Sequence, residues 1–364
     1  MRRLALACVL LAAACNTLPV GYDQIGRYAD ADSLDLYPDT VDSYGKPIAT
    51  GSAENMYLGY DNQYESRLII DFGLADSALD SVAAAQLILY PVDSTEMSFI
   101  CRPCSVPWNS SAASWHMADS ITQWFNPGGD YRNVRLASGT FAGESLVLDL
   151  DLDYLTTLVR ESHGIIVFPH DSGFVTVASR YSDATAPRIR FTYLDDTERE
   201  YVATADAHLV DTVDVEVGHQ QLLVGSGYAF RVFLRFSLDS IPSEATVARA
   251  DLVFRPLLQY WRSDTVEFGV HRMTEPYSRT ADFKSSGSAQ LSYAVSADSD
   301  TVARLDLRGL IQFWTAHPDS NFGLMLTAEP EWGELFRMRI PNSGPGAARL
   351  EVLFVMPPRD RFRP

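Results

Sequence analysis

Hydrophobic and polar residues alternate most regularly between positions 222 and 254. In its first half, one face carries Phe230, Val232, Leu234, Phe236 and Leu238, and the other carries Arg231, Phe233, Arg235 and Ser237. A two-residue period of this kind predicts a half-buried β-strand with a fixed core face. A turn at Pro242 follows, and a second alternating run then places Ala250, Leu252 and Phe254 on its core side.

A weaker copy of this pattern lies upstream. With Arg67 aligned to Arg231, the hydrophobic positions Leu68, Ile70, Phe72 and Leu74 fall opposite Val232, Leu234, Phe236 and Leu238. The next strand of the copy has Ala85, Leu87 and Leu89 at the matching positions. The offset of roughly 165 residues is too long for a solenoid repeat and indicates a duplicated domain.

The two copies also match toward their ends. The run Leu150, Asp151, Leu152 aligns with Leu305, Asp306, Leu307, and each run precedes a predicted amphipathic helix. The buried face of that helix is predicted to hold Leu307, Leu310, Ile311 and Trp314 in the second copy, and Leu152, Leu155 and Val159 in the first. A buried strand entered through Gly164 or Gly323 and an alternating strand at 186–193 or 348–354 close each copy.

Many short strands, Gly and Pro between them, and one short helix per copy predict an all-β chain. We expect two tandem antiparallel β-sandwich domains of jelly-roll-like topology, at residues 25–194 and 201–356. The charged run 195–200 is the predicted linker, and residues 357–364 form a tail. In the acidic segment 28–50, Leu34 and Leu36 alternate with acids and predict an edge strand; its carboxylates have no calcium-loop spacing and favour a solvated face.

The first 15 residues are typical of an export signal. Arg2 and Arg3 precede a short apolar run, and Cys15 follows three alanines in a pattern that resembles the bacterial lipobox, whose cysteine is diacylated. Leu11 lies one place earlier than the usual lipobox leucine, so an ordinary signal peptide with an incidental cysteine is the alternative. Residues 16–24 form a tether, and no other apolar run is long enough to span a bilayer. The expected location is the outer membrane or cell surface, with lipid as the only anchor.

The formal net charge of −18 argues against nucleic acid and other polyanionic partners, which require clustered Lys and Arg. Cys101 and Cys104 are candidates for a local disulfide in an exported protein; free thiols and a redox pair are the alternatives. A zinc site would need two further ligands. The seven histidines follow no metal or nucleophile motif, and no phosphate loop is present. We therefore expect no enzyme, no cofactor and no metal site.

Each half resembles a DNRLRE-type domain, the family that overlaps carbohydrate-binding module family 96. The resemblance rests on residues 231–236, the turn 241–247 and the strand 250–254, and on the spacing of Trp115, Trp124 and Pro127 in the first half. The closing strand at 186–193 and the segment from Leu305 to Trp314 also fit. The resemblance implies a sandwich fold and binding of a polysaccharide. Relatives that take acidic polysaccharides are expected to supply several Lys and Arg, whereas this chain is acidic, which argues against an alginate-like ligand.

Aromatic residues in the predicted loops are candidate platforms for sugar rings. These are Trp108, Tyr131, Tyr260, Trp261 and Trp332, with packing inside the loops as the alternative. Arg67 and Arg231 recur on the outer side of the same strand, where each could bind a ligand carboxylate or sulfate. The alternative for each arginine is an ion pair with a nearby acid or a contact that holds a loop.

Two functions fit these patterns. The first is a non-catalytic envelope lipoprotein whose tandem sandwiches bind an extracellular or cell-wall polysaccharide, where two weak sites on one tether gain from avidity. The second is a structural or assembly lipoprotein that docks an envelope protein partner and has no glycan ligand. Exposure of the loop aromatics in a groove would favour the first.

Overall fold

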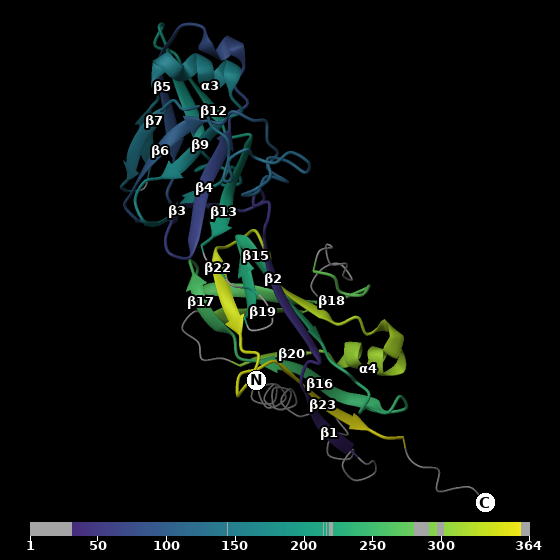
Figure 1. Ribbon diagram of the computed structural model, residues 1–364. Helices are drawn as coiled ribbons and strands as arrows, with labels where there is room; N and C mark the ends of the chain where they lie inside the picture. The colour runs from purple at the N-terminus through teal and green to yellow at the C-terminus, as the bar shows by residue number, and fades with distance from the viewer. Residues whose placement is uncertain are drawn as a thin grey trace, which may run out of the picture.

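The computed structural model describes residues 31–357 except 144, 214, 216, 218–220, 280–290 and 297–301. It is an all-β protein built of antiparallel sheets, with two α-helices among the described residues. Figure 1 shows two sandwiches arranged end to end, each covered by a helix. The predicted signal, Cys15 and the tether lie outside the described residues, as does nearly all of the predicted tail.

The first sandwich packs a seven-stranded sheet against a four-stranded one. The larger sheet contains, in order, β10 (Gly173–Ala178), β3 (Asn55–Tyr60), β4 (Tyr64–Asp71), β9 (Ile165–Pro169), β6 (Met97–Pro103) and β7 (Ala137–Phe141), and β13 (Ala205–Thr212) also pairs with β4. The smaller sheet has the order β12 (Glu198–Val202), β11 (Arg188–Tyr193), β5 (Val82–Leu89) and β8 (Leu146–Asp149). The helix α3 (Leu155–Glu161) and the 3₁₀ turns η2 (Asp76–Leu79) and η3 (Leu152–Tyr154) close one end.

The second sandwich has the same plan. Its larger sheet runs β17 (Leu257–Trp261), β22 (Phe336–Ile340), β14 (Leu222–Ser226), β15 (Tyr228–Arg235), β21 (Leu324–Ala328), β18 (Thr265–Arg272) and β19 (Leu291–Ser296), and β2 (Thr40–Pro47) also pairs with β15. Its smaller sheet runs β1 (Ala31–Leu36), β23 (Arg349–Val355), β16 (Thr246–Phe254) and β20 (Ala303–Asp306). The helix α4 (Arg308–Ala316) and the turn η4 (Pro318–Ser320) occupy the place of α3.

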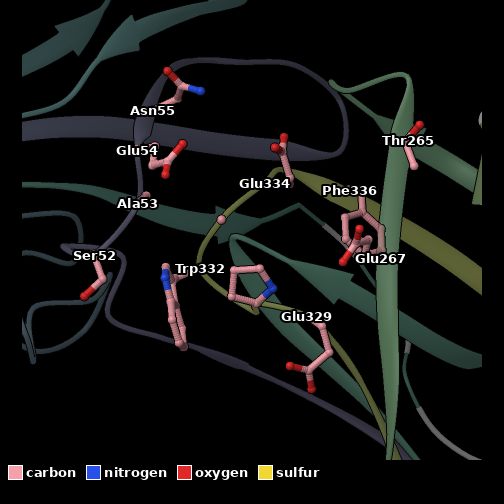
Figure 2. A pocket seen from close by; sticks show the side chains of 12 residues that line it. Ser52, Ala53, Glu54, Asn55, Thr265, Glu267, Glu329, Trp332, Glu334 and Phe336 are labelled. Atoms are coloured by element: carbon pink, nitrogen blue, oxygen red, sulfur yellow. The ribbon is translucent and has the colours of Figure 1, made fainter. Parts of the chain in front are cut away.

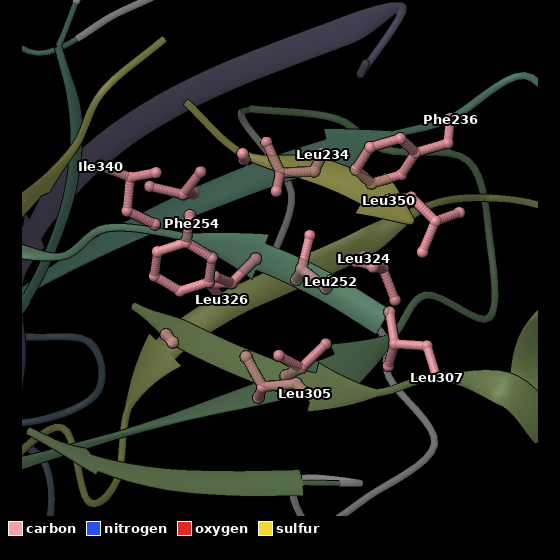
Figure 3. Packing of buried hydrophobic residues seen from close by; sticks show 14 of the residues in the cluster. Leu234, Phe236, Leu252, Phe254, Leu305, Leu307, Leu324, Leu326, Ile340 and Leu350 are labelled. Carbon is pink, nitrogen blue, oxygen red and sulfur yellow. The ribbon is translucent and has the colours of Figure 1, made fainter. Parts of the chain in front are cut away.

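Alternating side chains fill each sandwich core, as their two-residue period predicts. In the second core, Leu234 and Phe236 of the larger sheet meet Leu252, Phe254 and Leu350 of the smaller one (Figure 3). Trp314 of α4 lies within this core and is 1% exposed. The predicted β-sandwich class is therefore confirmed, and so is the predicted helix face in the second copy.

The two sandwiches exchange their first two strands. β1 and β2 precede the first sandwich in the chain but pair with β23 and β15 of the second. β12 and β13 precede the second sandwich but pair with β11 and β4 of the first. The sandwiches therefore do not coincide with the expected contiguous domains 25–194 and 201–356, because each sandwich includes two strands that lie next to the other one in the chain. The alternating pattern of an edge strand sets which face is buried, but it does not say which open sheet edge accepts it.

The strand registers confirm the duplication and correct one part of its alignment. Leu68 lies opposite Val167 and Val232 opposite Leu326, so Arg67 and Arg231 are equivalent as predicted. However, Leu87 pairs with Leu148 and Leu252 with Leu305, so it is Leu148, not Leu150, that corresponds to Leu305. The run from Leu148 to Leu152 alternates Leu and Asp, and such a pattern looks the same after a shift of two residues.

This two-residue shift also changes the buried face of the first helix. Leu152 is 43% exposed, and the buried residues of α3 are Leu155 and Leu158. The predicted face of Leu152, Leu155 and Val159 was therefore right only at Leu155. Leu152 is exposed because the chain continues through η3 before α3 begins, and Leu158, not the half-buried Val159, completes the core face.

Two buried titratable residues lie on the exchanged strand β13. Asp206 is 1% and His208 0% exposed. Burial lowers the pKa of His208 to about 3 from 6.5, and neither ring nitrogen has a hydrogen-bond partner among the described residues. Burial raises the pKa of Asp206 to about 6 from 3.8, although the Arg180 N–H donates to its Oδ2 at 2.6 Å.

The two groups have opposite effects on stability as pH falls. Below about pH 6.5 the unfolded chain binds a proton at His208 that the folded chain does not, so this residue destabilises the fold in acid. Below about pH 6 the folded chain binds a proton at Asp206 that the unfolded chain does not, so this residue stabilises the fold relative to neutral pH. Between the ordinary pKa values of aspartate and histidine, the two contributions to the pH dependence of the unfolding free energy largely cancel.

We expect single substitutions to reveal each contribution. From pH 7 to pH 5, His208→Phe should gain about 2 kcal/mol of unfolding free energy relative to the native chain, because it removes the unfolded-state proton. Asp206→Asn should lose about 1 kcal/mol over the same interval. Urea unfolding followed at several pH values measures both. Parallel pH profiles for the two variants would contradict this prediction.

Candidate functional site

Two of the predicted aromatic platforms lie in the junction between the sandwiches. Trp261, at the end of β17, is 44% exposed, and Trp332, in the segment between β21 and β22, is 42% exposed. Trp332 lines a cavity of about 400 Å³ and Trp261 lines one of about 540 Å³. Both cavities include Asn55 and Glu334, so they adjoin, and we call the pair the junction groove.

Residues from both sandwiches line the Trp332 cavity. The loop before β3 supplies Ser52, Ala53 and Glu54, and β3 itself supplies Asn55. The second sandwich supplies Thr265, Glu267 and the segment from Glu329 to Glu334. Figure 2 shows Trp332 between the strand-connecting loop of Ser52 and the segment that carries Glu329. The cavity therefore exists only because the sandwiches meet.

A set of internal contacts fixes the segment that carries Trp332. The buried Ser226 hydroxyl donates to the Glu331 carbonyl oxygen at 2.7 Å and accepts from the Glu334 N–H at 3.1 Å. Gly227, whose φ of 81° favours glycine, donates its N–H to the same carbonyl at 2.8 Å. Arg231 Nε and Nη2 each donate to a Glu331 carboxylate oxygen at 2.7 Å. These hydrogen bonds therefore fix the position of the loop that carries the Trp332 indole.

Two of the cavity carboxylates have internal hydrogen-bond partners. The Tyr57 hydroxyl donates to Glu334 Oε2 at 2.8 Å, and His271 Nε2 lies 2.6 Å from Glu329 Oε1. Burial raises the pKa of Glu334; the Tyr57 hydrogen bond opposes this rise and the charge of Glu54 adds to it. Glu54 and Glu267 are exposed and make no side-chain hydrogen bond to any described residue.

The Trp261 cavity contains an ion pair across the junction. Arg262 Nη2 lies 3.1 Å from Asp93 Oδ2 and also donates to the Phe174 carbonyl oxygen at 3.1 Å. Burial opposes the charge of Asp93, but hydrogen bonds from Thr176 and Thr95 outweigh it and keep the pKa of Asp93 below its ordinary value. The guanidinium is therefore neutralised within the groove.

Tyr260 packs inside the junction and is not a platform. Its ring centroid lies 4.8 Å from that of Tyr64 and 6.2 Å from that of Phe174, and burial raises its pKa. Buried aromatic and aliphatic residues of both sandwiches continue this contact: Tyr57, Tyr64, Phe174, Val210, Leu223, Phe230 and Leu335. This cluster joins the sandwiches beneath the groove.

The remaining aromatic candidates lie in the first sandwich, away from the groove. Trp108 is half-buried against the cluster of Trp115 and Trp124, and its Nε1 donates to the His163 carbonyl oxygen at 2.7 Å, so it anchors a loop. Tyr131 is 40% exposed, packs edge-on against Phe168, and has the Arg102 guanidinium 5.1 Å from its ring centroid. The structure thus separates these two from Trp261 and Trp332.

The two equivalent arginines hold loops, as their alternative interpretation predicts. Arg67 Nη2 donates to Glu65 Oε1 at 2.7 Å, its Nη1 donates to the Pro127 and Gly128 carbonyl oxygens, and its guanidinium lies over Trp115. Arg231 holds Glu331. Both guanidinium groups are engaged by the protein itself, which leaves neither as a free anion site.

The predicted disulfide is wrong, because Cys101 and Cys104 are both free and buried. Cys101 points into the core between the sheets of the first sandwich, whereas Cys104 belongs to the cluster of Trp115 and Trp124 outside it. Residues three apart on an extended strand face opposite sides, so the thiols are on opposite faces of the sheet. Burial raises the pKa of each thiol to about 12.

Sequence patterns did not reveal Glu54, Asn55, Asp93 and Glu334 as groove residues, because they come from three segments far apart in the chain with no shared motif. Within the described chain, no group of three or more His, Cys, Asp or Glu side chains is placed to hold a metal ion. No helix in the same residues is long and apolar enough to cross a membrane.

Comparisons with known proteins add little. No protein-family model and no curated protein matches the chain, so the DNRLRE resemblance stays a prediction. A crystal structure of a "putative secreted protein" from Parabacteroides distasonis is similar over 90% of this chain and 89% of that one, with 8% identity and a TM-score of 0.17. The N-terminal CBM22-1–CBM22-2 tandem domain of Paenibacillus barcinonensis Xyn10C is similar over 90% and 97%, with 7% identity and a TM-score of 0.17. Structural similarity at TM-scores this low carries no information about a ligand.

Proposed function

We propose that this chain is a non-catalytic polysaccharide-binding protein of the cell envelope, exported and anchored through a lipid on Cys15. The binding site is the junction groove. The observation that carries the proposal is the pair of half-exposed indoles, Trp261 and Trp332, on adjoining cavities lined by amide, hydroxyl and carboxylate groups.

The chemistry of the groove suits sugar rings. An indole offers a flat apolar face to the C–H side of a pyranose, while polar side chains around it bond to the hydroxyl groups. Asn55, Thr265 and Glu334 supply such groups beside Trp332. Because the loop of Trp332 is held by Ser226 and Arg231, little ordering entropy is lost when a ligand binds.

We assign the groove carboxylates to binding and not to hydrolysis, because two of the four in the Trp332 cavity, Glu329 and Glu334, are engaged by internal contacts. Glycoside hydrolysis needs one carboxyl group that protonates the leaving oxygen and a second one across the bond. Glu334 accepts a hydrogen bond from Tyr57, and Glu329 is engaged by His271 and Thr327, so both are occupied by structural contacts. We expect no release of reducing ends from any retained polysaccharide.

Affinity gels and a glycan array test this proposal. We expect retention on at least one polysaccharide, with affinity reduced about tenfold by Trp332→Ala and similarly by Trp261→Ala, equivalent to about 1.4 kcal/mol each. Tyr131→Ala is the matched control, because it removes an equally exposed aromatic away from the groove and should change nothing. Retention that survives both tryptophan substitutions would place binding elsewhere. Absence of retention on every polysaccharide would overturn the proposal.

The assembly function is the second candidate. The exchanged strands and the aromatic cluster join the sandwiches end to end, an arrangement that suits a spacer or docking unit (Figure 1). Recovery of a stoichiometric envelope protein with the lipid-anchored chain, together with failure of the glycan experiment, would favour it.

A further inference from the structure

The two halves of the junction groove differ in charge. The side chains around the Trp332 cavity include four carboxylates, Glu54, Glu267, Glu329 and Glu334, and no Lys, Arg or His among the described lining residues. The Trp261 cavity contains Arg262, which Asp93 pairs with at 3.1 Å, and two further carboxylates, Asp264 and Glu334, the second of which also lines the Trp332 cavity. Both ends of the groove are therefore acidic, and the Trp332 end is the more negative because none of its described lining residues is a cation.

Internal contacts do not neutralise the Trp332 end. Tyr57 and Thr327 give hydrogen bonds to Glu334 and Glu329, and only His271 beside Glu329 could carry a positive charge. Glu54 and Glu267 have no partner among the described residues, and Glu54 lies close enough to Glu334 to repel its charge. A bound neutral sugar offers these carboxylates hydroxyl hydrogen bonds but no charge to offset their mutual repulsion, whereas a cationic ligand offers both.

We infer that the junction groove takes a single linear glycan that bears protonated amines, with an amine in the Trp332 cavity and a neighbouring sugar ring on Trp261. This inference rests on the proposed function and names its ligand class. The indole face of Trp332 and the surrounding carboxylates both attract a cation, and their effects reinforce each other in a partly dehydrated cavity. Uronate or sulfate groups would be repelled by the same carboxylates.

Matched oligosaccharides test the amine directly. The probes are a β-1,4-linked glucosamine hexasaccharide and its fully N-acetylated counterpart, measured by titration calorimetry at pH 5.5, where the amines are protonated. We expect the amine form to bind at least about tenfold more tightly, with an affinity that falls as salt rises. Trp332→Ala should weaken this binding by about tenfold.

Charge-matched variants separate the site from general attraction to an acidic protein. Glu54→Gln with Glu267→Gln should remove most of the preference for the amine form. Glu244→Gln with Asp153→Asn changes the net charge equally at exposed positions elsewhere and should leave the preference unchanged. An equal loss in both double variants would overturn the inference.

The other outcomes distinguish the inference from the proposed function. If the N-acetylated form binds as well or better and depends on Trp332, polysaccharide binding stands and the amine assignment fails. The amine assignment also fails, while polysaccharide binding stands, if an amine-free polysaccharide is retained in a way that depends on Trp332 and the glucosamine hexamer does not bind. A lysine hexamer that binds more tightly than the glucosamine hexamer would overturn the glycan assignment. If nothing binds at the groove, both fail.

Discussion

Removal of residues 31–47 will unfold the second sandwich and leave the first one folded. β2 pairs with β15 along its whole length, from Thr40 opposite Arg235 to Pro47 opposite Tyr228, and β1 pairs with six residues of β23. Each lost backbone hydrogen bond costs about 0.5–1.5 kcal/mol, and the sum approaches the about 5–15 kcal/mol by which a whole domain is stable.

Side chains of the two strands also complete the second sandwich. Leu34, Leu36 and Val41 pack against its core, and the Tyr44 hydroxyl accepts from Arg231 at 3.2 Å. Asp42 binds Arg279 and accepts from the Tyr277 hydroxyl at 2.7 Å. Burial opposes the charge of Asp42, but these hydrogen bonds outweigh it and lower its pKa. Truncation therefore exposes a long sheet edge and leaves polar partners unpaired.

Fragments make the measurement. We expect the chain from 48 to 364 to show one cooperative unfolding transition in place of two, and hydrogen exchange to lose protection in β14–β23. A peptide of residues 31–47 added in trans should restore it by strand addition, while the same peptide with Leu36→Asp and Val41→Asp should not. A fragment of residues 48–212 should fold, because it keeps β12 and β13. Cooperative folding of an isolated 201–356 fragment at full stability would refute the exchange.

Glu331→Ala will destabilise the second sandwich by about 3–5 kcal/mol. The substitution leaves the Arg231 guanidinium, 8% exposed in its side chain, without the two carboxylate oxygens that it binds. An unpaired buried charge is far more costly than the pair is favourable, so the double change Arg231→Met with Glu331→Leu should recover most of the loss. Urea unfolding of the native chain and of the two variants measures both free-energy differences.

The ion pair of the equivalent arginine in the first sandwich, whose carboxylate comes from its own strand β4, is the control for this result. Arg67 and Glu65 lie 2.7 Å apart but their side chains are 18% and 37% exposed, so water can replace the lost partner. Glu65→Ala should cost about 1 kcal/mol or less. Because Glu331 also holds the loop of Trp332, its loss should weaken glycan binding, whereas Trp332→Ala should weaken binding without changing stability. Equal stability losses at Glu65 and Glu331 would show that burial does not govern these pairs.

The sequence predicted part of the candidate site, but only as residue types that commonly contact ligands when they lie in loops. Trp261 and Trp332 were predicted because aromatics in loops commonly contact ligands. Trp108 and Tyr260 belonged to the same list, and nothing in their local sequence distinguishes them; their neighbours in space, His163 and Tyr64, decide that they are packed. Glu54 and Glu334 became groove residues only when loops 280 positions apart met (334 minus 54).

The sequence alone predicted several core strands with their buried faces, the duplication and the helix that carries Trp314, because each of these follows from a local period of hydrophobic residues. It did not reveal β12, part of which lies in the charged run 195–200 that was predicted as a linker. It also determined that Arg67 and Arg231 are equivalent. Only the tertiary structure decided which sheet edge each first strand pair joins, that Leu148 aligns with Leu305, and that Cys101 and Cys104 face opposite sides of a sheet. A period of two fixes a face, but it leaves free the partner edge and any shift by two residues, and those are settled by packing between distant parts of the chain.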